Sequence, residues 1–247
     1  MSSLIIVDRI LTILATLIFP FLLAFWFFKN YKKSWKTVGI GALSYFIINL
    51  IIGVTMLLIS FVNPDSPKYF LISFFGLIPG VLAAIFEEIV RLFSMKLFLK
   101  KTFNWQNAFL FGIGWGGVES IIFGFGKIFE LVVLGNEPIF SYLLPFGISR
   151  IVAIFGQIAL SILMVQVFIQ RKPIFFLYAF SYHTTVNIIL TLLSPMISKG
   201  GIIRYTTDIF VWIILIILPL VIIHKFEKEK RFSNIIKNSI KKVFDFY

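Results

Sequence analysis

The sequence predicts an all-α protein that crosses a membrane about seven times and ends in an amphipathic interfacial helix. Three observations predict this fold class. Hydrophobic residues make up 59% of the 247 residues and the mean hydropathy is +0.98, which is more apolar surface than a soluble domain of this length can bury. The apolar residues fall into runs that are long enough to span a bilayer. The breaks between these runs are short and polar.

Seven apolar runs have spanning length, at about 4–28, 37–62, 69–97, 106–134, 147–170, 174–194 and 206–224. Basic residues concentrate in the first, third and fifth breaks and after the last run. Because basic loops stay on the cytoplasmic side, this pattern predicts a multi-pass protein of the cell membrane with its N-terminus outside and its C-terminus in the cytoplasm. The third and fourth runs exceed about 20 residues, so we expect these helices to tilt or to extend beyond the bilayer.

The segment 231–247 has a different pattern from the runs before it. Its apolar residues recur at helical spacing and lysines occupy the other side. This pattern predicts a basic amphipathic helix that lies on the inner leaflet. The sequence contains no internal repeat and no low-complexity linker, so we expect residues 1–230 to form a single transmembrane domain.

The charge and the absence of cysteine exclude several kinds of site. The net charge is +12, but the basic residues lie between apolar runs, so we expect a lipid bilayer as partner and no nucleic acid. The chain has no cysteine, which excludes disulfide bonds and thiolate metal sites. The first apolar run lacks a preceding basic segment and a small-residue cleavage site, so it is expected to be a retained helix.

Three charged residues, Glu87, Glu88 and Arg91, lie inside the third apolar run. A charge at the centre of a bilayer costs about 2.5–3.5 kcal/mol on insertion scales, so these groups must be paired, hydrated or used. Glu87 and Arg91 are four residues apart on a helix and Glu88 and Arg91 are three apart, so we expect both carboxylates to reach the guanidinium. A carboxylate held among such neighbours suits general-base catalysis.

The fourth run contains small residues at every fourth position, Gly112, Gly116, Ser120 and Gly124. Such a face allows two helices to pack closely in lipid. Glu119 projects from the edge of this face. Two interpretations stay open for it, a carboxylate held at a functional site or a structural ion pair with Arg91 or Arg150.

The sixth run places His183 and Asn187 one turn apart on the same helix face. At 1.5 Å per residue, Glu87 lies about 15 Å, Glu119 about 20 Å and His183 about 14 Å from the inner ends of their runs. These depths are similar. We therefore expect Glu87, Arg91, Glu119 and His183 to converge on one polar cavity in the cytoplasmic half of the membrane.

Three motifs in this order, Glu-Glu-x-x-Arg, Gly-x-Gly-x-Gly-Gly-x-Glu and His-x-x-x-Asn, resemble the YhfC-type membrane peptidases. These form a branch of the CAAX protease and bacteriocin-processing (Abi) superfamily of intramembrane glutamic proteases. The resemblance runs from about Phe75 to Asn187. It implies a catalytic site in which Glu87 activates water and His183 and Asn187 polarise the substrate. Glu88, Arg91 and Glu119 would complete that site.

The chain departs from the pattern of this branch at two places. Trp115 stands where the branch usually has a histidine, and Ser149, Arg150 and Gln157 stand where it usually has Glu-Arg followed by a histidine. One histidine with carboxylates and amides suits hard cations better than zinc. The sequence therefore requires no cofactor and gives only weak support to a divalent metal.

Three functions remain open on these grounds. The first is an intramembrane endopeptidase, glutamic or metallo-type, that hydrolyses a membrane or lipid-proximal peptide with glutamate-activated water. The second is a catalytically inactive relative that binds a membrane peptide, in bacteriocin self-immunity or as a partner subunit, and the missing histidines favour it. The third is a transporter or permease component that relays ions, which the absence of repeats disfavours.

Overall fold

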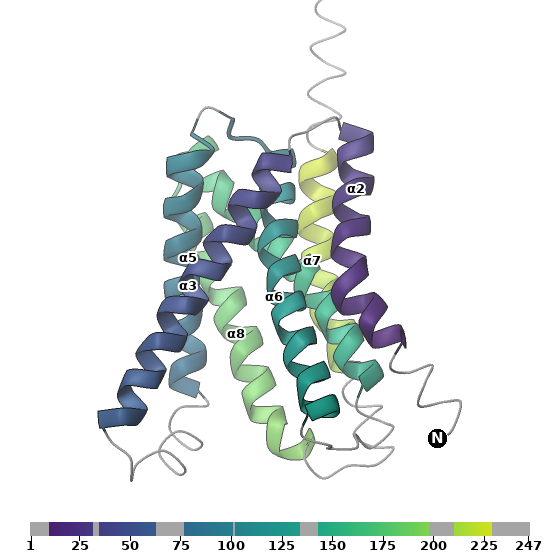
Figure 1. Ribbon diagram of the computed structural model, residues 1–247. Coiled ribbons are helices and arrows are strands. Elements are labelled where there is room, and N and C mark those ends of the chain that lie inside the picture. Colours follow the sequence, from purple (N-terminus) through teal and green to yellow (C-terminus); the bar gives the residue numbers. More distant parts are fainter. Residues whose placement is uncertain are drawn as a thin grey trace, which may run out of the picture.

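The computed structural model describes residues 10–31, 35–62, 77–100, 102–133, 143–197 and 210–228. Every regular element in these ranges is a helix, so the prediction of an all-α fold is confirmed (Figure 1). The elements are the π-helix η1 (Leu14–Ile18), α2 (Phe19–Tyr31), α3 (Trp35–Val62), α5 (Leu77–Phe98), α6 (Trp105–Val133), α7 (Leu143–Ile169), α8 (Ile174–Ile197) and a last helix at Phe210–Lys228. The predicted amphipathic helix at 231–247 lies outside the described residues.

Six stretches of the described helices are long and apolar enough to cross a membrane, which confirms the polytopic membrane architecture. They are Ile10–Tyr31, Trp35–Thr55, Trp105–Gly126, Phe146–Ile169, Ile174–Leu192 and Phe210–Lys228. The remaining long helix, α5, has the length to span a bilayer. It is less apolar than the other six, because it carries Glu87, Glu88, Arg91 and Lys96. The charged residues that distinguish α5 in the sequence thus also make it less apolar than the other helices of the bundle. The predicted orientation of the termini stays a prediction.

The first span contains a π turn just before a proline, and this turn packs on α6. The Phe19 amide donates to the Leu14 carbonyl, which closes a wide π turn immediately before Pro20. Proline has no backbone N–H to donate, and π turns occur as single wide turns within α-helices. Within this turn the span contacts α6, where a Cβ added at Gly124 would lie 2.7 Å from the Thr16 hydroxyl oxygen.

Helix α6 lies between α3 and α7, and its glycines let both neighbours approach closely (Figure 1). A Cβ added at Gly112 would lie 2.5 Å from the Cα of Ile158 on α7. On another side of α6, a Cβ at Gly114 would lie 2.9 Å from the Ala42 amide nitrogen on α3. The predicted small-residue seam is therefore real, and α6 has a second close contact that its four-residue spacing did not reveal.

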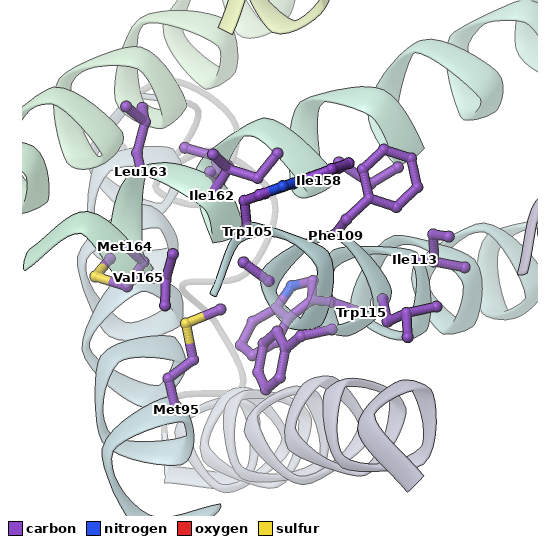
Figure 2. Close-up of a cluster of buried hydrophobic side chains, with 14 of the residues drawn as sticks. Met95, Trp105, Phe109, Ile113, Trp115, Ile158, Ile162, Leu163, Met164 and Val165 are labelled. Atoms are coloured by element: carbon purple, nitrogen blue, oxygen red, sulfur yellow. The ribbon is translucent and has the colours of Figure 1, made fainter. Parts of the chain in front are cut away.

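Apolar side chains from α5, α6 and α7 enclose the centre of the bundle. Figure 2 shows part of this cluster, with Met95 from α5, the ring of Trp115 from α6 and Ile158 and Ile162 from α7. Large apolar residues on α2, α3 and the last helix are instead exposed, as expected where helices face lipid. Polar groups on the inner faces of α5, α6 and α7 are thus held in an enclosed environment.

Two hydrogen bonds hold α8 between α5 and the last helix. The Asn187 amide donates to the Gly80 carbonyl of α5 over 2.9 Å. The Tyr182 hydroxyl donates to the Leu215 carbonyl of the last helix over 3.2 Å. A Cβ added at Gly80 would lie 3.3 Å from the Asn187 Cβ, so the α5–α8 approach is close here. This contact places the histidine of α8 beside the carboxylates of α5.

Candidate active site

Arg91, Glu88 and His183 form the buried centre of the candidate site. The Arg91 Nε donates to Glu88 Oε2 over 3.0 Å, and both side chains have no exposed surface. The other Glu88 oxygen lies 2.8 Å from His183 Nδ1. Because a carboxylate paired with arginine only accepts hydrogen bonds, Nδ1 carries a hydrogen and donates it to Glu88. The second nitrogen of the imidazole, Nε2, is thereby directed away from Glu88.

Glu87 faces that second nitrogen. Its Oε2 lies 4.0 Å from His183 Nε2, with the Glu87 side chain 13% exposed and that of His183 9% exposed. The Glu87 Oε2 atom is buried and has no hydrogen-bond partner among the described residues. A buried carboxylate oxygen without such a partner is costly, so the arrangement suits a group that handles a proton or a polar ligand.

The adjacent glutamates therefore have different partners. We expected Arg91 to reach both carboxylates, but its hydrogen bond within α5 goes to Glu88, three residues away, while Glu87 approaches His183 on α8. The remaining Arg91 donors turn to α7. They reach the Ser161 hydroxyl over 2.7 Å and both the backbone and the side-chain oxygen of Gln157. Arg91 is thus held by α7 as well as by α5.

Gln157 of α7 connects this centre to a second ion pair. Its amide nitrogen donates to Glu119 Oε2 over 2.7 Å. The other Glu119 oxygen accepts from Arg150 Nη1 over 3.3 Å, and each of these two side chains is 13% exposed. Of the two partners that the sequence left open for Glu119, Arg150 is the one observed. The Arg150 guanidinium also lies 4.8 Å from the ring centroid of Phe123.

A cavity of about 80 Å³ lies between α7, α8 and the last helix, beside this network. Its polar wall is formed by Glu119, Arg150, Gln157, His183 and Asn187. Its apolar wall includes Val152, Leu190, Trp212 and Leu215. A small pocket with a few convergent polar groups in an apolar setting is typical of a binding site.

The structure gathers the predicted residues around this cavity but in two layers. Glu119, His183 and Asn187 line it, whereas Arg91 and Glu88 are fully buried behind its wall. Glu87 approaches the cavity through His183. The expectation that Glu87 and Arg91 themselves line the cavity is therefore wrong. Arg91 makes four hydrogen bonds to acceptors on α5 and α7, so a residue that the sequence placed in the pocket supports the pocket from behind.

Sequence reasoning undervalued two residues of α7. Gln157 was noticed only as a replacement for a histidine, and Ser161 was not singled out at all. Both are buried polar side chains within a membrane-spanning run, one helical turn apart, and both accept from Arg91. Polar side chains that share a face of a spanning helix commonly bond across the helix interface, and this spacing was the available signal.

Comparison with known proteins shows the family to which the chain is similar. The model of a family described as "YhfC intramembrane metalloprotease" matches residues 15–137 and 133–215. An uncharacterized membrane protein named YhfC, from Bacillus subtilis strain 168, is 28% identical to this chain, and the alignment covers 80% of this chain and 86% of that protein. No solved structure matches the chain significantly.

The name of that family implies a resident metal ion, and the donors in the described residues do not fit one. Catalytic zinc sites use three protein ligands, and no group of three histidine, aspartate or glutamate side chains in the described ranges could hold a metal ion. Glu88 gives one oxygen to Arg91 and the other to His183. This leaves Glu87 Oε2 and His183 Nε2, which are two ligands rather than three.

Proposed function

Because the chain belongs to the YhfC intramembrane metalloprotease family, we propose that it is an intramembrane peptidase that hydrolyses a membrane or lipid-proximal peptide with water activated by Glu87. The observation that carries this proposal is the 4.0 Å separation of Glu87 Oε2 from His183 Nε2, on an imidazole whose other nitrogen is held by Glu88. A water molecule could form normal hydrogen bonds of about 2.8 Å to both atoms at this separation.

Glu87 has the role of general base in this reaction. It takes a proton from the water as the water oxygen attacks the peptide carbonyl carbon, and the carbonyl electrons move onto the carbonyl oxygen. When the carbon–nitrogen bond breaks, Glu87 returns the proton to the departing nitrogen. The products are a carboxylic acid and an amine, and no other reactant is needed.

His183 and Asn187 support the negative charge that develops on the carbonyl oxygen. Protonated His183 can donate from Nε2, since Glu88 occupies Nδ1 and stabilises the imidazolium. The Asn187 amide holds the Gly80 carbonyl with one of its hydrogens, and an amide has a second hydrogen to donate. Both residues line the cavity in which the peptide would lie. Such donors typically contribute 10²–10³ in rate each.

The test is cleavage of a transmembrane peptide by the full chain in liposomes. Glu87→Gln should lower the rate by about 10²–10⁴, because the amide keeps the shape of the side chain but cannot accept the proton. Glu227→Gln is the matched control, since this carboxylate accepts a hydrogen bond from Tyr31 and lies outside the site. Unchanged cleavage by Glu87→Gln would refute the proposal.

A second candidate function is binding of a membrane peptide without cleavage. It is favoured by the environments of the two positions where a further imidazole was expected. The Trp115 ring is fully buried, and the Gln157 amide is used by Arg91 and Glu119. In the same liposomes, this candidate predicts that wild type and Glu87→Gln bind the peptide equally and that neither cleaves it. Enlarging the cavity with Trp212→Ala should then weaken binding.

A further inference from the structure

We infer that Gln157 is a positioning residue that fixes the imidazole of His183 through Arg91 and Glu88. Gln157 does not contact His183 itself. Its effect on the reaction rests on the peptidase proposed above, but its effect on the imidazole does not.

The inference starts from a continuous chain of hydrogen bonds across four helices. From α6, Glu119 accepts from the Gln157 nitrogen on α7 over 2.7 Å. The Gln157 oxygen accepts from Arg91 Nη2 on α5. Arg91 Nε then donates to one oxygen of Glu88 over 3.0 Å, and the other Glu88 oxygen accepts from His183 on α8 over 2.8 Å. Within this series of hydrogen bonds, Gln157, Arg91 and Glu88 each use one polar atom for one neighbour and a different polar atom for the other.

The chemistry of an amide suits the place of Gln157 in this chain. Arginine only donates hydrogen bonds and an ionised glutamate only accepts them. The residue between Arg91 and Glu119 must therefore accept on one side and donate on the other. A primary amide does both, and it does so in one orientation only, because a flipped amide would face donor with donor and acceptor with acceptor. The two ion pairs thus hold Gln157 in a single orientation.

The charge of the site also requires a neutral residue at position 157. The three carboxylates of Glu87, Glu88 and Glu119 face two guanidiniums and the imidazole of His183. With His183 protonated these charges balance. A glutamate at position 157 would add a carboxylate against Glu119, and a lysine would add a cation against Arg91. Either change would leave an uncompensated charge in an enclosed part of the bundle.

Gln157 also limits how Arg91 can turn. Its backbone oxygen accepts from Nη1 over 3.3 Å, while its side chain accepts from Nη2, so a single residue holds both ends of the guanidinium. Ser161 accepts only from Nη1. When the side-chain acceptor is lost, Nη2 loses this partner, and the guanidinium can tilt about its remaining bonds to Glu88, Ser161 and the Gln157 backbone oxygen. Glu88 then has a second orientation, and His183 Nδ1 loses its fixed acceptor.

The state of His183 can be read directly by nitrogen NMR of the imidazole. The chain has only 2 histidines, so the full-length protein with His224→Gln and labelled histidine gives the signals of His183 alone. The parent protein should show Nδ1 carrying hydrogen in a single state. Gln157→Met keeps the length of the side chain and removes both hydrogen bonds. Gln157→Asn keeps the amide but is one methylene too short to reach both partners.

Both variants should raise the fraction of His183 whose Nδ1 carries no hydrogen on the order of tenfold, which corresponds to the net contribution of about one hydrogen bond. Ser161→Ala is the matched control, because it removes another Arg91 acceptor one turn along α7 and leaves the Gln157 bridge intact. It should leave the imidazole signals unchanged. If Gln157→Met does not fold, Gln157→Asn decides.

Imidazole signals that stay the same in the folded Gln157 variants would overturn the inference. An equal change in Ser161→Ala would also overturn it, because Arg91 would then be held by no particular acceptor. These results are independent of cleavage. If a peptide is cleaved, Gln157→Met should lower kcat by about 100-fold, as misplacement of a catalytic group does, and leave KM within about twofold. Altered imidazole signals without any cleavage would uphold the inference and refute the peptidase.

Discussion

The guanidinium of Arg91 lies over the indole ring of Trp115, with its Cζ 4.2 Å from the ring centroid. Both side chains are fully buried. The edge of the guanidinium donates hydrogen bonds to Glu88, Gln157 and Ser161. The indole ring therefore covers the flat face of the guanidinium, which makes no hydrogen bonds. Trp115 thereby stabilises the one cation of α5 that is buried in the bundle.

Loss of this cation should cost more stability than loss of the charge on Glu87. Arg91→Leu leaves Glu88 buried without its arginine, a penalty of about 3–5 kcal/mol. Glu87→Gln keeps the shape of the side chain and removes no hydrogen bond that Glu87 Oε2 makes to a described residue. Thermal unfolding in detergent measures both. Arg150→Leu is the control, since the partly exposed Arg150–Glu119 pair should be lost at lower cost. Equal melting temperatures for Arg91→Leu and Glu87→Gln would contradict the role of Arg91.

Trp115 should tolerate phenylalanine better than alanine. Trp115→Phe keeps an aromatic face for Arg91 and leaves a small gap. Trp115→Ala removes the face and opens a cavity, which costs about 3–5 kcal/mol for a large core side chain. Urea unfolding of the detergent-solubilised protein gives the two values. Similar losses for both variants would show that packing volume matters here and that the aromatic face does not.

Gly112→Ala should separate α6 from α7. The added Cβ would lie 2.5 Å from the Cα of Ile158, and backbone atoms cannot move aside as a flexible side chain can. Gly126→Ala on the same helix is the control, because nothing lies within 4 Å of its added Cβ, and alanine there should be neutral or stabilise by up to about 1 kcal/mol. The melting temperature should fall for Gly112→Ala and stay the same or rise for Gly126→Ala. A Gly112→Ala protein as stable as wild type would refute the close seam.

The purified protein should not retain zinc. After expression with added zinc, metal analysis should give far less than one ion per chain, and a chelator should leave the melting temperature unchanged. The reason is the pair of remaining donors, Glu87 and His183, where catalytic zinc uses three protein ligands. About one zinc per chain, lost in His183→Ala, would contradict this prediction.

The helical spans could be predicted from the sequence because the hydrophobic runs are long and their breaks are polar. The run at 174–194 corresponds to α8 at Ile174–Ile197, and the run at 106–134 to α6 at Trp105–Val133. Spacing along one helix also predicted the Glu88–Arg91 pair and the α6 seam. These features depend on local periodicity, which the sequence displays directly.

The partner of each charged group across helices could not be predicted. Glu87 and Glu88 are both spaced along α5 so that they could pair with Arg91. Which of them does so depends on the rotation of α5 against α7 and α8. That rotation places Gln157 and Ser161 on the far side of Arg91 and His183 between the two glutamates. Helix rotation is set by close packing in three dimensions, which a single sequence does not reveal.

The two ion pairs differ in when they can form during insertion into the membrane. Glu88 and Arg91 lie on one helix, so they can neutralise each other as soon as α5 is helical. Glu119 and Arg150 lie on α6 and α7, so each enters the bilayer without the other and gains its partner only when the two helices meet. Association of α6 with α7 is therefore driven by two unmatched charges as well as by the glycine seam. A chain stalled before α7 is made would hold Glu119 in the bilayer without its Arg150 partner, at the cost of an unpaired intramembrane charge.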